Sequence, residues 1–143
     1  AKELKQEQEE TTKKDAVLVE MTDAEKAKAE QERKDELLLS MYESKEDVIS
    51  VFNKKISKID QSLGILNARD ESLAQKLKRM NRKYKQAKSE STRMGLSMQI
   101  EAAKQGLNDY QKAIETNRAD KEVVTEQYRQ TLIRFNHLTK SDH

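Results

Sequence analysis

A cluster of basic side chains is the part of this sequence whose residue types suggest binding chemistry. Between positions 76 and 93 there are eight lysines and arginines and a single acid, Glu90. The eight are Lys76, Lys78, Arg79, Arg82, Lys83, Lys85, Lys88 and Arg93. Such cations bind phosphates, anionic lipid or an acidic protein surface. A solvated coiled-coil exterior is the preferred interpretation, and the eight are the candidate partner-binding residues of the alternative.

Other chemistry is poorly represented. The chain has no Cys, and its two histidines, His137 and His143, have no His or carboxylate neighbour at the spacing of a helical metal pair. Three scattered glycines cannot form a phosphate-binding loop. The sequence therefore predicts no catalytic, cofactor-binding or metal-binding residue, and we expect a protein that is not an enzyme.

The composition favours long helices over a globular core. Only 34% of residues are hydrophobic and 38% are charged, and Pro is absent, which suits helices that bury one narrow stripe. The formal net charge of +2 says little about the class of partner. No stretch approaches the roughly 20 apolar residues of a membrane-spanning helix.

Two apolar repeats with alternating spacings of three and four residues predict the fold. The first passes through Ile49, Phe52, Ile56, Ile59, Leu63, Leu66, Asp70, Leu73, Leu77, Met80, Tyr84 and Ala87. The second passes through Ile100, Ala103, Leu107, Tyr110, Ile114, Asn117, Lys121, Val124, Tyr128, Thr131, Phe135 and Leu138. This spacing is the seam of a left-handed coiled coil. The sequence predicts an all-α fold with a long antiparallel coiled-coil helical hairpin.

The chain divides into three parts in this interpretation. Residues 1–21 form a polar tail with a short apolar patch, 22–43 an N-terminal helix, and 44–140 the hairpin. Thr22 and Ser44 begin two sequences of the capping-box type and mark the helix starts. We expect the hairpin helices at about 45–88 and 97–138, with a turn at about 89–96 that uses Gly95.

Three polar residues interrupt the apolar seams: Asp70 in the first, Asn117 and Lys121 in the second. In an antiparallel pair of helices, the numbers of two residues that face each other add to a constant. If that constant is about 187, Asp70 lies opposite Asn117 and Lys121 is one layer away. A polar layer of this kind fixes the alignment of two helices at some cost in stability. We predict that these three residues form a register-setting polar layer.

Apolar residues at the end of the N-terminal helix suggest a wider base. Leu37, Leu38 and Met41 are among its large apolar side chains, and Val48, Val51, Leu132 and Ile133 lie beside the seams at the open end of the hairpin. We expect the N-terminal helix to pack there, or this apolar surface to dock a partner or a second copy.

One block of the sequence resembles a group of uncharacterised coiled-coil proteins of proteobacteria. The residues that carry the resemblance are 35–48 (DELLLSMYESKEDV), Ile56 and Ile59–Asp60. In that group a Leu-Leu-Leu-Ser-Thr-Tyr-Ser-Ser run followed by Asp-Ile precedes a long helical hairpin. Met41 stands here in place of Thr, and 53–54 is Asn-Lys instead of Arg-Asp. The resemblance implies export to the bacterial periplasm or envelope. It implies no particular activity, because that group is uncharacterised.

Shape and charge then suggest two functions. The first is a spacer, adaptor or assembly protein that acts by protein–protein contact, with another protein or a second copy as partner. The second is a polyanion-binding module that uses the basic cluster for nucleic acid or an anionic membrane surface. The first is preferred because the bases surround the helix instead of forming one stripe, and no exposed aromatic accompanies them.

Overall fold

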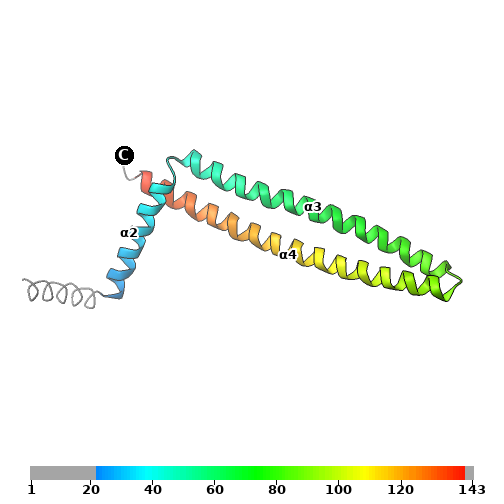
Figure 1. Ribbon diagram of the computed structural model, residues 1–143. Helices are drawn as coiled ribbons and strands as arrows, with labels where there is room; N and C mark the ends of the chain where they lie inside the picture. Colours follow the sequence, from blue (N-terminus) through cyan, green and yellow to red (C-terminus); the bar gives the residue numbers. More distant parts are fainter. Residues whose placement is uncertain (1–21, 141–143) are drawn as a thin grey trace, which may run out of the picture. The chain divides into compact units, whose positions relative to one another are not determined.

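Three helices make up the described part of the chain, residues 22–140 of a computed structural model. They are α2 (Asp23–Met41), α3 (Lys45–Gln86) and α4 (Glu90–Lys140). Helices α3 and α4 run antiparallel, side by side, and are joined by a short turn (Figure 1). The predicted all-α antiparallel hairpin is confirmed. At about 1.5 Å per residue, the 42 residues of α3 extend roughly 63 Å.

Capping residues set where α2 and α3 begin, as the sequence indicates. The Thr22 hydroxyl accepts a hydrogen bond from the backbone N–H of Glu25 at 3.2 Å. The Ser44 hydroxyl accepts one from the N–H of Asp47 at 3.1 Å. Such side-chain caps supply acceptors to N–H groups of the first helical turn, which have no carbonyl four residues earlier in the helix.

The turn of the hairpin is shorter and earlier than the predicted 89–96. Helix α3 ends at Gln86 and α4 begins at Glu90, with Ser89 as its cap. The Ser89 hydroxyl accepts from the N–H of Thr92 at 3.1 Å and donates to the Thr92 hydroxyl at 2.7 Å. Gly95 lies inside α4, and no described glycine has a positive φ. The capping hydrogen bonds of Ser89 therefore fix the position of the turn. The prediction that Gly95 forms the turn is wrong.

The apolar seam has the composition that the repeats predict. Every seam residue named from the two repeats is buried or half-buried except Tyr84, which is 39% exposed. A distal cluster consists of Met80, Ile100 and Ala103 with Leu73 and Leu77 packed against it. Since the surface is buried along a line, the helices are stabilised by many modest contacts and few fully enclosed side chains.

The register differs from the predicted one by about one heptad. Phe52 stacks on Tyr128 with ring centroids 5.3 Å apart, and the Asn117 amide donates to the Ser62 hydroxyl at 3.0 Å. The facing numbers in both pairs add to 179–180, about seven below the predicted 187. The earlier turn explains this shift. When the centre of the turn moves back by three to four residues, the sum of facing residue numbers falls by about seven.

The predicted polar layer is consequently not formed. Lys121 makes an ion pair with Asp60, Nζ to Oδ1 2.7 Å, and Asn117 bonds Ser62. Asp70 lies level with position 110 in the observed register, and its Oδ1 atom is buried without a hydrogen-bond partner. The structure brings together Asn117 and Lys121 with α3 partners that the sequence analysis missed, and leaves Asp70 apart from both.

The described chain divides into two compact units: residues 44–136, the hairpin, and residues 22–43 together with 137–140. In the second unit α2 has no buried residue. Within this unit Leu37 and Met41 are 60% and 59% exposed. Residues 1–21, predicted as a tail, lie outside the described part.

Glycine substitutions give a test of the observed packing. A Cβ atom at Gly64 or Gly95 would meet nothing within 4 Å, whereas one at Gly106 would lie 2.8 Å from Leu73 Cδ2. We expect Gly64→Ala and Gly95→Ala to raise the free energy of unfolding by about 0.5–1 kcal/mol, because Ala favours the helix. Gly106→Leu should lower it by about 1–3 kcal/mol through overpacking.

Urea unfolding followed by circular dichroism measures all three variants. Gly106→Ala should fall between them, since the Leu73 methyl group must move to admit it. In the register originally predicted, position 106 faces position 81 and not 73. Equal stabilisation by Ala at all three glycines would therefore contradict the observed packing.

Candidate partner-binding surface

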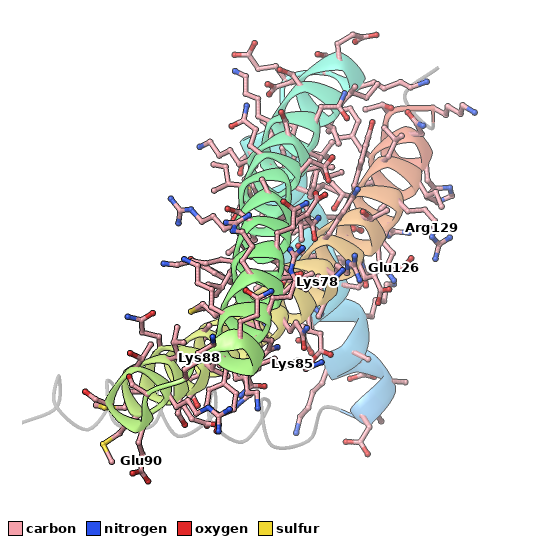
Figure 2. The ribbon with its side chains drawn as sticks, turned by 90° about the vertical axis from the view of Figure 1, so that its right-hand side faces the viewer. Lys78, Lys85, Lys88, Glu90, Glu126 and Arg129 are labelled. Carbon is pink, nitrogen blue, oxygen red and sulfur yellow. The ribbon has the colours of Figure 1, made fainter. Side chains whose placement is uncertain are left out.

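The basic cluster lies in the part of the hairpin next to its turn. We call residues 73–107 the distal half. Seven of the cluster's residues belong to the end of α3 and the turn, and Arg93 belongs to the first turns of α4. All eight are exposed. Figure 2 labels Lys78, Lys85 and Lys88, which belong to the end of α3 and the turn.

The charges of the cluster are not neutralised within the described part of the chain. Ion pairs there join Lys34 to Glu30, Lys104 to Glu101, Lys121 to Asp60 and Arg129 to Glu126. None of them includes a member of the basic cluster. The end of α3 from Lys76 to Gln86 contains no acid at all. The distal half therefore carries a local excess of positive charge on a chain that is nearly neutral overall.

Arg93 differs from the other seven because it holds the turn together. Its Nε–H donates to the Ala87 carbonyl oxygen at 3.0 Å. Its guanidinium carbon lies 5.7 Å from the centre of the Tyr84 ring, within the range of a cation–π contact. A cation that bonds the last carbonyls of a helix stabilises its C-terminus. The principal role of Arg93 is thus structural.

One open hollow lies on the basic side of α3. It has a volume of about 420 Å³ and is lined by Lys78, Asn81, Arg82 and Lys85. These positions are three and four residues apart, so their side chains share one helix face. The sequence predicts bases that surround the helix, whereas the structure gathers three of them, with an amide, around this hollow.

Two exposed methionines follow the turn, on α4. Met94 and Met98 are 67% and 72% exposed on α4, whereas Leu96 between them is half-buried. Of these three side chains, only Leu96 is partly buried. Two exposed, flexible apolar side chains four residues apart offer a small adaptable contact area.

Comparisons with known proteins leave function to be inferred from these side chains. No known protein family, curated protein or solved structure matches the chain.

Glu126 and Arg129, three residues apart on α4, change each other's pKa. Arg129 donates to both oxygens of Glu126, which lowers the pKa of the Glu126 carboxyl, and a hydrogen bond from Gln130 adds to this effect. The same contact raises the pKa of Arg129. The pair is seen on α4 in Figure 2. Both groups are at the surface, so this is a helix-surface contact that loses its ionic part when acid protonates Glu126.

The described residues contain neither a metal-binding cluster nor a membrane-spanning helix. No cluster of three or more His, Asp or Glu side chains could hold a metal ion there. His137 is exposed on α4, and His143 lies outside the described residues. No described helix is long and apolar enough to cross a membrane.

Proposed function

We propose that this protein is a non-enzymatic adaptor or assembly protein that binds another protein through the distal half of its hairpin. The observation that carries the proposal is the combination of exposed methionines with cations that have no carboxylate partner in the described chain. Apolar and charged groups left exposed together are typical of a protein-binding surface. The long α3–α4 pair holds that surface well away from its own open end.

The arrangement of the seam supports a presenting role. Met80, Ile100 and Ala103 are 6%, 8% and 5% exposed, so the distal half has its own packed interior. A surface on two packed helices is pre-organised, which reduces the ordering cost of binding. Cations near it would attract an acidic partner and raise the rate of association.

Affinity capture from the protein's native cells tests the proposal. We expect Met94→Ser/Met98→Ser to reduce the recovery of a specific partner protein about tenfold, since it removes the apolar part of the surface. The matched control is Ile65→Ser/Val123→Ser, which changes two side chains of similar exposure (54% and 56%) outside the distal half. Quantitative mass spectrometry compares the recovered proteins. A partner lost equally from both variants, or from neither, would contradict binding by the distal half.

Polyanion binding is the second candidate, favoured by the hollow that Lys78, Asn81, Arg82 and Lys85 line. If phosphates are the ligand, affinity for a duplex of about 20 base pairs should fall by roughly two or more powers of ten between about 50 and 200 mM salt. Lys78→Glu/Arg82→Glu/Lys85→Glu should abolish that binding. Fluorescence anisotropy gives both results. Salt-independent binding, or none at low salt, would exclude this candidate.

A further inference from the structure

A second hollow lies between the two helices in the distal half. It has a volume of about 440 Å³ and is lined by Leu73, Lys76, Met80, Gln99, Ala102 and Ala103. We call it the distal groove. Met80 and Ala103 are only 6% and 5% exposed, so they belong to the packed interior and form an apolar floor. Because the side chain of Ala102 is small, it leaves the α4 side of the groove open.

One side of the distal groove is cationic. Lys76 lines it, and Arg79 and Lys83 follow at spacings of three and seven residues, which places all three along the same side of α3. All three are exposed and make no ion pair with a described carboxylate. On α4, residues 91–108 contain one acid, Glu101, whose carboxylate pairs with Lys104 at 3.7 Å. No carboxylate of the hairpin itself therefore neutralises this side of the groove.

We infer that the distal groove binds an acidic amphipathic helix of a partner protein, forming a local three-helix bundle. This inference rests on the proposed function and names the chemistry of its partner. The partner helix would place apolar side chains over Met80 and Ala103 and carboxylates beside Lys76, Arg79 and Lys83. A helix that binds in a groove does so through apolar side chains spaced three and four residues apart. This spacing suits a groove between two helices.

Charge and polarity together select this occupant. A nucleic acid backbone would use the cations but has nothing to place on an apolar floor. A bilayer surface cannot enter a groove between two helices. An uncharged apolar helix would leave three cations beside it without partners, which lowers affinity and specificity. An acidic amphipathic helix satisfies the floor and the cationic side at once.

The test uses the full chain and a designed helical peptide of about 20 residues, with leucines at coiled-coil spacing and glutamates beside them. A peptide of the same composition in scrambled order keeps the charge and loses the apolar stripe. Binding is measured by fluorescence anisotropy at about 150 mM salt. We expect the amphipathic peptide to bind at least tenfold more tightly than the scrambled one, and a 20-base-pair duplex to bind no better than the scrambled peptide.

Two variants locate the binding. Ala102→Gln places a longer, helix-compatible side chain in the groove, and Lys76→Glu/Arg79→Glu/Lys83→Glu reverses its cationic side. Each should weaken peptide binding at least tenfold. The control is Lys78→Glu/Arg82→Glu/Lys85→Glu, which reverses three charges around the other hollow and should change the affinity less than threefold. Circular dichroism confirms that each variant is folded.

Several results would overturn the inference. Equal binding of both peptides, equal loss in both triple variants, or peptide binding unaffected by Ala102→Gln would mean that charge alone attracts the ligand. Absence of peptide binding would mean that the groove is not a docking site. If the native partner is still captured in a Met94- and Met98-dependent way, the proposed function stands and only the groove inference fails.

Discussion

Phe52→Ala should lower the free energy of unfolding of the hairpin by about 3–5 kcal/mol, the usual cost of removing a buried aromatic ring. Phe52 is 4% exposed and stacks on Tyr128, with the ring planes 5° apart. The Lys55 ammonium lies 5.0 Å from the centre of the same ring. The seam buries few side chains so completely, so the loss has little nearby packing to offset it. The melting temperature should fall by roughly 10 °C or more.

Urea and thermal unfolding by circular dichroism measure this change. Ile65→Ala is the matched control, because Ile65 lies on the same helix but is 54% exposed, and it should change stability by less than about 0.5 kcal/mol. A double-mutant cycle with Tyr128→Ala should give a coupling of about 0.5–1.5 kcal/mol, as expected for stacked rings. A coupling near zero would mean that Phe52 and Tyr128 do not face each other in solution.

The helices and their buried stripe could be predicted from sequence alone. Spacings of three and four residues place Phe52, Ile114 and Phe135 on the inner face whatever the partner helix does. The capping signals at Thr22 and Ser44 likewise act within four residues of chain. Helix periodicity and capping depend only on residues close together in the sequence, not on the tertiary packing, and the structure agrees with them.

The register could not be predicted because a heptad repeat is nearly unchanged by a slip of seven residues. Facing numbers that add to 180 or to 187 both bring one apolar seam against the other. Grouping Asp70 with Asn117 and placing the turn at Gly95 both favour a sum of 187. In the structure Ser89 caps α4 ahead of Gly95, and the shorter turn decides the alignment.

The residues of the candidate surface could be predicted from the sequence, but the shape of that surface could not. The charges of the basic cluster and their exposure follow from the sequence. The distal groove does not, because it depends on Ala102 and Ala103 lying level with Met80, which only the correct register provides. The exposure of Met94 and Met98 depends in the same way on α4 beginning at Glu90.

Asp70→Leu should raise the free energy of unfolding by about 1–3 kcal/mol. The Oδ1 atom of Asp70 is buried with no hydrogen-bond partner, and such an atom loses its hydration without compensation. Leucine at this position would continue the apolar seam between Leu66 and Leu73 and bury further surface. The neighbouring Glu71→Leu is the control: Glu71 is exposed, so its replacement should have little effect on urea unfolding.

The same variant shows which residues set the register. If the Asn117–Ser62 bond and the Lys121–Asp60 ion pair fix the alignment, Asp70→Leu leaves it unchanged. Because the chain has no cysteine, an engineered pair reports alignment directly. Ser62→Cys/Asn117→Cys should form an intramolecular disulfide with or without Asp70→Leu. Asp70→Cys/Asn117→Cys should not, since position 70 lies about 12 Å along α3 from position 62.

Two outcomes would contradict this account of the hairpin. A disulfide between positions 70 and 117 would show that the hairpin adopts the alternative register, one heptad away. Loss of the 62–117 disulfide in the Asp70→Leu background, or new oligomers in sedimentation velocity, would show that Asp70 excludes other alignments. In that case its buried oxygen would be the cost of a specific register, as polar residues are in other coiled-coil seams. The distal groove would then depend on Asp70 as well, because Ala102 and Met80 share it only in the observed alignment.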